Sequence, residues 1–456
     1  MSEKPAGKAR NIGSMGLGYF VNSAQEISLP LLFPAIKNSF VPVLTNSNLA
    51  VIDGVRVIIQ TMISPLWGMA SDLYSRKKVL VIGTGLWGGL TIICGFSTQH
   101  WHLLASWVVA CIGIGALVPA GFSMLADLYG PQERGKAIGI LNALGMLGLV
   151  AGALGLGVLM GMTESKDGAA PVLAATAAWR YGFFAIGALS ILAAVVIAVL
   201  VREPARGSAE PEMDGLIADL AASQFRFKAE DIKVILQNRT VLLAFLQGFF
   251  VLTSLFLLYK FFATWMVEER GFENSTADMV FGIIIIGLVI GTLVGGLAAD
   301  RAERLKPARG RAMVAQLAIF MVIPAMAVLV TMAKGLPAII GCASVIAFFI
   351  EWPRRSALQP MIQNVMPPEL RGTALALAEF FQGGLASVLL IFLAMYSDRF
   401  SLDRAMLYGG CGCLSLAFLI GFGFYRTYPA DLERQRLKMQ KRRELIQGQG
   451  QEEKRS

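Results

Sequence analysis

The chain contains the stretch Gly68-Met-Ala-Ser-Asp72-Leu-Tyr-Ser-Arg76-Lys77 and, in a later loop, the similar stretch Gly296-Leu-Ala-Ala-Asp300-Arg301-Ala-Glu-Arg304. Both have the spacing G-x-x-x-D-x-x-x-R, and each lies between two long apolar runs. One copy of so short a pattern is weak evidence. Two copies at corresponding places in the chain predict an internal repeat.

A second pair of similar loops supports the repeat. One loop reads Pro131-Gln-Glu133-Arg134-Gly135, and the other reads Pro368-Glu369-Leu-Arg371-Gly372. Each lies two apolar runs beyond its copy of the first motif. The two halves of the chain are therefore expected to share one topology.

The apolar runs predict a polytopic membrane protein of the all-α class. Of the 456 residues, 55% are hydrophobic and 16% are charged, against about 25% charged in soluble domains. The mean hydropathy is +0.61. A membrane-spanning helix needs about 20 mostly apolar residues, and twelve such stretches are present. They are 14–35, 49–71, 78–97, 102–127, 135–160, 179–201, 241–266, 277–299, 312–333, 336–363, 372–396 and 405–426.

The predicted spans divide the chain into five parts. Residues 1–13 form an N-terminal segment, 14–201 a first six-helix bundle, 202–240 a charged linker, 241–426 a second bundle and 427–456 a basic tail. A short surface helix is expected in the linker near Ile232–Leu236. The tail could contact anionic lipid. A solvated topology signal is the alternative for the tail.

The charge distribution predicts the orientation. The net charge is +9, and about 29 of the 40 Lys and Arg residues lie in the N-terminal segment, the even-numbered loops, the linker and the tail. Loops on the cytoplasmic side collect Lys and Arg. We therefore expect a protein of the inner (plasma) membrane with both termini in the cytoplasm. The positive charge is explained by this topology, so no nucleic-acid partner is expected.

The repeated loops are candidates for a gate. A glycine lets two helix ends approach closely, an aspartate accepts hydrogen bonds from free amides, and an arginine can lock the contact. The alternative is a static topology anchor. The candidate gating residues are Gly68, Asp72, Arg76, Lys77, Arg134, Gly296, Asp300, Arg304 and Arg371.

These motifs resemble those of the major facilitator superfamily, over about residues 14–426. The segment from Gly113 to Pro119, with Asp127 and Arg134 after it, is similar to the family's fourth-helix region, which adds Asp127 to the gating candidates. The resemblance implies two pseudo-symmetric six-helix bundles around a central cavity, alternating access and a monomer. Residues 126–128 followed by Arg134 are similar to Spinster-like lipid transporters.

Two positions depart from the family pattern. Val109 stands where the family often has an arginine, and the fifth span contains Gly145, Gly148 and Gly152 without the proline of the drug antiporters. Proton-coupled drug antiport is therefore disfavoured.

The tenth span contains charged residues close to its midpoint, in Glu351-Trp352-Pro353-Arg354-Arg355. A proline removes a backbone donor, so we expect the helix to bend there. Charges at this depth face a cavity or a partner. The repeat places Leu117 and Val118 of the fourth span at the same depth, so the two halves differ: one is apolar and the other cationic.

This asymmetry favours an anionic or amphiphilic substrate. An arginine can hold a carboxylate or phosphate through two parallel hydrogen bonds, so Arg354, Arg355 or both are expected to bind the substrate. Neutralisation by Glu351, Glu26 or Glu379 is the alternative. Lys260 is a further candidate, unless it extends to the membrane surface. Polar or aromatic residues of the first, seventh and tenth spans complete the predicted substrate site: Glu351, Trp352, Tyr259, Gln25 and Asn22.

Four ionisable residues are candidates for proton coupling: Glu26, Asp53, Arg56 and Glu379. Asp53 and Arg56 are three residues apart and can pair on one helix face. Movement of an arginine between conformations would make proton binding by a nearby carboxyl depend on the conformation. A permanent structural pair, sodium coupling and uncoupled exchange remain as alternatives.

The sequence therefore predicts a secondary active transporter of a small organic anion or anionic amphiphile, with the lipid bilayer and a co-transported proton as further partners. The alternatives are a Spinster-like lysolipid or glycolipid transporter and a non-transporting membrane sensor or scaffold. No enzyme activity is expected, because His100 and His102 are the only histidines and no nucleotide-binding P-loop is present. No catalytic residue, metal site or cofactor is expected.

Overall fold

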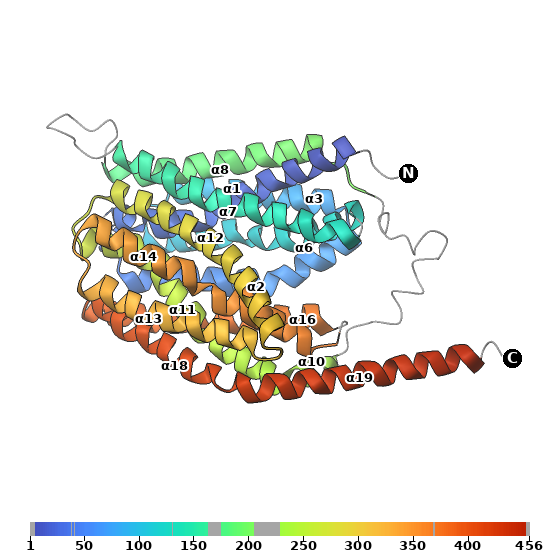
Figure 1. The fold of residues 1–456 in the computed structure, drawn as a ribbon. Helices are drawn as coiled ribbons and strands as arrows, with labels where there is room; N and C mark the ends of the chain where they lie inside the picture. The colour runs from blue at the N-terminus through green and yellow to red at the C-terminus, as the bar shows by residue number, and fades with distance from the viewer. Residues whose placement is uncertain are drawn as a thin grey trace. The chain divides into compact units, whose positions relative to one another are not determined.

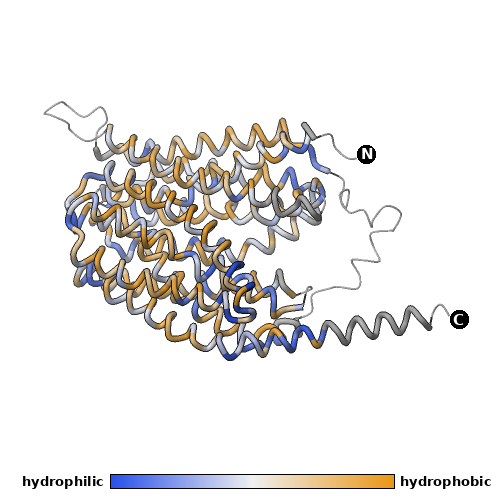
Figure 2. Tube along the Cα trace, in the orientation of Figure 1, coloured by the Kyte–Doolittle hydropathy of each residue, from blue (hydrophilic) through white to orange (hydrophobic). Residues whose placement is uncertain are grey.

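The computed structural model describes the backbone of residues 5–37, 39–40, 42–129, 131–162, 175–204, 229–367 and 370–452. These residues form helices joined by short connections, and none of them lies in a β-strand. In Figure 2 apolar residues follow the helices, and hydrophilic residues gather mainly at the turns. The fold is that of an all-α polytopic membrane protein.

The predicted spans correspond to single helices or to short stacks of helical segments. In chain order these are α1 (Pro5–Lys37), α2 (Asn46–Leu73), α3 (Arg76–Val81) with η1 (Ile82–Trp87) and α4 (Thr91–Gly95), α5 (His100–Ile112) with α6 (Ile114–Leu128), α7 (Pro131–Gly161), α8 (Ala175–Leu200), α11 (Arg239–Glu268), α12 (Asn274–Leu305), α13 (Gly310–Thr331), α14 (Leu336–Ile350) with η3 (Trp352–Leu358) and α15 (Gln359–Val365), α16 (Arg371–Arg399), and α17 (Leu402–Arg404) with η5 (Ala405–Gly410) and α18 (Cys411–Gly421).

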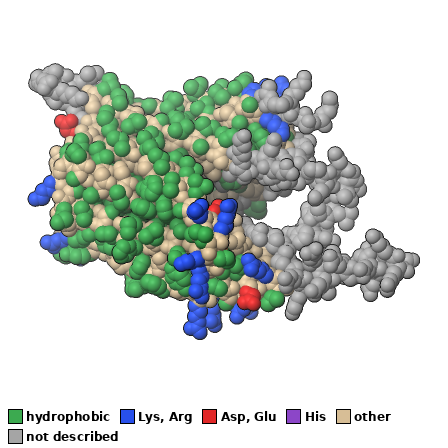
Figure 3. Space-filling model, in the orientation of Figure 1, with side chains coloured by type: hydrophobic (Ala, Val, Ile, Leu, Met, Phe, Trp, Pro, Cys, Tyr) green, Lys and Arg blue, Asp and Glu red, His purple; other side chains and the backbone are tan. Residues whose placement is uncertain are grey.

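Eleven of these twelve elements are long and apolar enough to cross a membrane, by length and composition. The remaining one is α1, which contains the predicted span 14–35. At 33 residues it is long enough, but its centre is polar, with Asn22, Gln25 and Glu26. In Figure 3 apolar side chains cover most of the visible face, as expected for helices that contact lipid.

One compact unit comprises Met1–Gln224, Phe256–Ile286 and Ser387–Met406. Within it α1 packs against both α7 and α8, and Figure 1 shows these three helices side by side. The α1–α7 contact depends on small residues, because a Cβ atom at Gly148 would lie 2.0 Å from the carbonyl oxygen of Phe20. The glycines of the fifth span therefore permit close backbone approach.

The other compact unit comprises Phe225–Leu255, Gly287–Ala386 and Leu407–Ser456. Its linker residues include α10 (Ala229–Gln237), in the place where a short helix was predicted, and its tail forms α19 (Phe424–Glu452). Asp431 of α19 accepts hydrogen bonds from the backbone nitrogen (3.0 Å) and hydroxyl (2.8 Å) of Thr240. The beginning of the tail is therefore fixed to the beginning of α11. The division into sequence halves at 14–201 and 241–426 stays a prediction.

Candidate functional site

The tenth span is interrupted where its charged residues lie. The α-helical segment α14 ends at Ile350, and Trp352–Leu358 continue as the π-helical segment η3. Pro353 has no amide hydrogen to continue the α-helical pattern. Short π-helical segments inside helices are frequent at functional sites. The local sequence thus explains why the helix changes geometry at this depth.

Arg354 is buried and bridges two carboxylates. Its Nη1 atom lies 2.8 Å from Oε1 of Glu379 on α16, and its Nη2 atom lies 3.3 Å from Oε1 of Glu351. Only 8% of the Arg354 side chain and 5% of the Glu351 side chain are exposed. Both carboxylates neutralise Arg354 in this conformation, and substrate binding by Arg354 stays a prediction.

Arg355 is in a different environment from its neighbour. Its side chain is 46% exposed, and its Nε atom lies 3.2 Å from Oε2 of Glu351. Glu379 is also half exposed, at 49%. An exposed charge within a span cannot face hydrocarbon at acceptable cost, so these two side chains indicate a surface in contact with water.

Trp352 lies in a helix contact rather than on this exposed surface. Its ring packs at 4.8 Å from that of Phe349 and 5.4 Å from that of Phe348. It also lies against Gly295 of α12, where a Cβ atom would be 2.6 Å from the indole ring. In this conformation Trp352 supports the position of η3.

A second charged cluster lies in the other unit. Asp53 of α2 accepts a hydrogen bond from Nε of Arg56 at 2.7 Å and lies 2.5 Å from Nζ of Lys260 on α11. All three side chains are buried. The structure therefore brings Lys260 to Asp53, a pairing that the sequence did not indicate.

Glu26 of α1 is the partly exposed member of this cluster. Its Oε1 atom lies 3.5 Å from Nη1 of Arg56, and 39% of its side chain is exposed. The same Arg56 nitrogen donates a hydrogen bond to Gln60 at 2.8 Å. Two carboxylates and two cations thus form a network with balanced charge, in which Glu26 is the group most accessible to water.

Three further residues predicted to bind substrate are close in sequence to Glu26 or Lys260 of the second cluster, and two of them have contacts within the protein. Gln25 is buried and donates a hydrogen bond to the Thr91 hydroxyl at 2.7 Å. The Tyr259 ring packs against Phe281, with 5.3 Å between ring centroids. Asn22 is half-buried on α1.

The first motif loop is held by Arg76, the first residue of α3. Its guanidinium pairs with Asp127 at the end of α6 and donates to the carbonyl oxygens of Ser123 and Pro204, both at 3.2 Å. Gly68 lies 3.8 Å, measured from an ideal Cβ, from Pro119 of α6. Lys77 is half-buried. The side chains of Asp72, Arg134 and Arg371 lie outside the described part of the structure.

The second motif loop is held in a similar way by Arg311, near the beginning of α13. Its Nη2 atom lies 2.6 Å from Asp300, and its Nη1 atom donates to the carbonyl oxygen of Ser356 in η3 at 3.1 Å. In both units an arginine at the start of the third helix thus joins a carboxylate to a backbone carbonyl of the fourth span. Gly296 has open space beside it, and Arg304 is exposed.

Sequence reasoning did not single out Arg311 or Glu203. The signal for Arg311 is its place at the start of the third span of its half, where Arg76 stands in the first half. Glu203 follows α8 directly and accepts a hydrogen bond from the backbone nitrogen of Arg76 at 2.9 Å. It also accepts one from the Ser75 hydroxyl.

Glu203 gives the first loop a predicted pH dependence. Partial burial opposes ionisation of its carboxyl, but the hydrogen bonds from Ser75 and Arg76 prevail and lower the pKa of Glu203 below its ordinary value of 4.5. A lowered carboxyl pKa contributes stability above the unfolded-state pKa, and this contribution disappears as the pH falls through the folded-state pKa. We expect Glu203→Gln to lower the melting temperature by a few degrees at pH 7. The difference from the wild type should shrink below pH 4.

The control for this experiment is Glu433→Gln, because Glu433 is exposed on α19. This variant should melt like the wild type at both pH values. A Glu203→Gln deficit of the same size at pH 7 and below pH 4 would contradict the assignment.

The family model described as Major Facilitator Superfamily matches residues 15–390. The chain belongs to the major facilitator superfamily. The two motif loops and the charged tenth span are thus features of a member of a family of membrane transporters.

Individual relatives of this superfamily member are distant. It is 23% identical to the probable sulfoacetate transporter SauU of Cupriavidus necator, over 66% of this chain and 67% of the relative. It is 22% identical to protein spinster homolog 1 of Xenopus laevis, over 63% of this chain and 53% of that protein. The match therefore spans about half the length of the Spinster relative.

The fold matches that of solved transporters. The crystal structure of a bacterial homolog of the human lysosomal transporter Spinster, in an inward-facing and occupied conformation, aligns with a TM-score of 0.77. The sequences are 19% identical, and the alignment covers 94% of this chain and 99% of the other. At this identity the likeness shows the fold.

Proposed function

We propose that this protein is a secondary active transporter that moves a small organic anion or anionic amphiphile by alternating access. The observation that carries the proposal is the contrast between Arg354 and Arg355. The first is buried between two carboxylates, while the second is half exposed within a span. Arg355 is the arginine that can exchange its internal contact for a substrate.

The chemistry of Arg355 defines the substrate class. A guanidinium binds carboxylate, sulfonate or phosphate groups through paired hydrogen bonds. The contact of Arg355 with Glu351 uses Nε, and Glu351 is shared with Arg354. An anionic substrate group can therefore bind Arg355 without leaving Glu351 unpaired. The likeness to a probable sulfoacetate transporter supports a small organic anion.

A Spinster-like transporter of a lysolipid or glycolipid is the second candidate. The likeness in fold to the bacterial Spinster homolog supports it. The exposed Glu379 is followed by Phe380, of which 45% is exposed, so polar and apolar groups adjoin on α16. An amphiphile presents both kinds of surface.

We assign proton coupling to the Glu26, Asp53, Arg56 and Lys260 network. Glu26 is the exposed member of this network and has the longest contact, 3.5 Å, so water can reach its carboxyl group. Asp53 is held by two cations. Protonation of Glu26 would remove its negative charge and weaken its ion pair with Arg56. Protonation would therefore favour a conformation in which Arg56 is not paired with Glu26. Glu379, beside Arg354, is the corresponding candidate in the other cluster.

The arginine contacts at the two motif loops are assigned to gating. Arg76 joins the start of the third span to Asp127 at the end of the fourth span, and Arg311 joins Asp300 to the fourth span of its half. Each contact joins helices of one half, and we propose that it forms in one conformation of the transporter and breaks in another. We further propose that the protein functions as a monomer in the inner membrane, with both termini in the cytoplasm.

Binding is tested on the purified full-length protein by the shift in melting temperature with sulfoacetate, lysophosphatidylglycerol and xylose as probes. A ligand of the folded state raises the melting temperature. We expect stabilisation by one of the two anionic probes and none by xylose. Loss of a charge-assisted contact in Arg355→Gln should weaken the anion about 10- to 100-fold.

The matched control is Arg399→Gln, since Arg399 is an exposed arginine at the end of α16. This variant should bind like the wild type. Stabilisation by xylose alone, or equal anion affinity in Arg355→Gln and the wild type, would contradict the proposal. An uptake rate that is the same with and without an imposed pH gradient would exclude proton coupling.

A further inference from the structure

One face of α12 changes from apolar to basic along the helix. Ile290, Leu293 and Leu297 are exposed at spacings of three and four residues, and 73% of Leu297 is accessible. The same face continues with Arg301 and Arg304, which are both exposed. Such a face suits contact with lipid chains along the span and with headgroups at its end.

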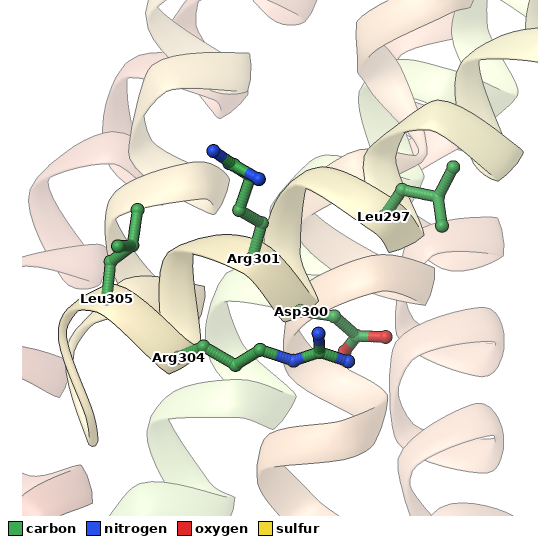
Figure 4. A pocket seen from close by; sticks show the side chains of 5 residues that line it. All are labelled: Leu297, Asp300, Arg301, Arg304 and Leu305. Carbon is green, nitrogen blue, oxygen red and sulfur yellow. The ribbon is translucent and has the colours of Figure 1, made fainter.

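A pocket lies at the basic end of this face. It is lined by Leu297, Asp300, Arg301, Arg304 and Leu305. Figure 4 shows Arg301 extending from the helix on the same side as Leu297 and Leu305, while Arg304 reaches along the helix toward Asp300. Two guanidinium groups and two exposed leucines therefore adjoin in one hollow.

The two carboxylates near this pocket, Asp300 and Glu303, interact with other groups of the protein. Asp300 pairs with Arg311 at 2.6 Å. Glu303 accepts hydrogen bonds from the backbone nitrogens of Ala308 (2.9 Å) and Arg311 (3.1 Å). Among the described residues, no carboxylate lies within 4.0 Å of a guanidinium nitrogen of Arg301 or Arg304. The pocket therefore has an excess of positive charge.

We propose that this pocket binds the headgroup of an anionic phospholipid, with the phosphate between Arg301 and Arg304 and an acyl chain along Leu297 and Leu293. Basic pockets beside transmembrane helices are suited to such headgroups. The charge is complementary, and the apolar face continues from the pocket into the span. A free anion or a nucleic acid would use the arginines but would leave the leucines without a partner.

The test uses the purified full-length protein in detergent, titrated with dioleoylphosphatidylglycerol or dioleoylphosphatidylcholine while its melting temperature is followed. The anionic lipid should stabilise the protein at a lower concentration than the zwitterionic lipid. Each basic residue near an anionic headgroup strengthens binding about fivefold. Arg301→Gln/Arg304→Gln should therefore require about 10- to 30-fold more of the anionic lipid.

Several controls make the test specific. Without lipid the double variant should melt like the wild type; if it does not, the single variants replace it, each with about a fivefold effect. Arg399→Gln/Arg404→Gln should retain the full lipid effect, because both arginines are exposed elsewhere. Arg355→Gln should also retain it, which separates this pocket from the proposed substrate site.

Four results would overturn the proposal. They are equal stabilisation by both lipids, an unchanged lipid preference in Arg301→Gln/Arg304→Gln, an equal effect of inorganic phosphate alone, and loss of the preference in Arg434→Gln/Arg436→Gln. The third result would assign the pocket to a free anion. The fourth would place the lipid contact on α19.

Discussion

The Arg354→Gln variant is expected to unfold at a much lower temperature than the wild type, while Arg355→Gln unfolds near the wild-type temperature. Removal of Arg354 leaves the buried carboxylate of Glu351 with the half-exposed Arg355 alone, and takes a hydrogen bond from Glu379. Loss of one partner of a buried ion pair costs about 3–5 kcal/mol. Loss of a half-exposed pair costs about 1 kcal/mol or less.

Thermal unfolding of both variants in the same detergent measures this difference. The double variant Arg354→Gln/Glu351→Gln should recover part of the loss, because it removes both buried charges. Equal destabilisation by Arg354→Gln and Arg355→Gln would mean that the two arginines do not have the separate roles assigned to them.

A similarly large effect is expected for Asp53→Asn. The substitution leaves the buried cations of Arg56 and Lys260 with Glu26 as their nearest carboxylate, 3.5 Å from Arg56. Uncompensated buried charge again costs about 3–5 kcal/mol. Lys260→Met should be milder, because Asp53 keeps its hydrogen bond with Arg56 at 2.7 Å.

Unfolding of the two single variants and of Asp53→Asn/Lys260→Met completes a double-mutant cycle. The double variant should be more stable than Asp53→Asn alone. Two results would contradict the buried ion pair. One is a loss in the free energy of unfolding that is as large for Lys260→Met as for Asp53→Asn, and the other is a loss in the double variant that equals the sum of the two single losses.

Much of the fold could be predicted from the sequence because the membrane imposes a simple pattern. Apolar runs of about 20 residues located the spans, and the repeated loops predicted two related halves. The first span was the least apolar, and α1 is the element that falls short of the hydropathy expected of a span. Its polar residues Gln25 and Glu26 have partners within the protein instead.

The charged residues could be named from the sequence, but their pairing could not. Asp53 and Arg56 are close in the chain, so their contact follows from helix geometry. Lys260 is on a distant helix, and its contact with Asp53 depends on how α2 and α11 pack. Spacing also could not separate Arg354 from Arg355, because the π-helical turn of η3 alters the direction of each side chain.

The repeated motif predicted only some of the residues that form contacts at the loops. It indicated Asp300 and Arg304, while the structure pairs Asp300 with Arg311 across the loop. The repeated motif contains residues of one helix and the loop after it. The Asp300–Arg311 contact instead joins the end of α12 to the start of α13. A comparison of the starts of α3 and α13 would have identified Arg311.

Uptake of a labelled organic anion into liposomes that contain the purified protein tests the central claim most directly. Labelled sulfoacetate is the first probe and labelled lysophosphatidylglycerol the second, and Arg355→Gln and Arg399→Gln are measured beside the wild type. We expect saturable uptake of one of these anions by the wild type and by Arg399→Gln, and uptake at least about 10-fold weaker in Arg355→Gln at low anion concentration. Equal uptake by Arg355→Gln and the wild type, or transport of neutral sugars alone, would contradict it.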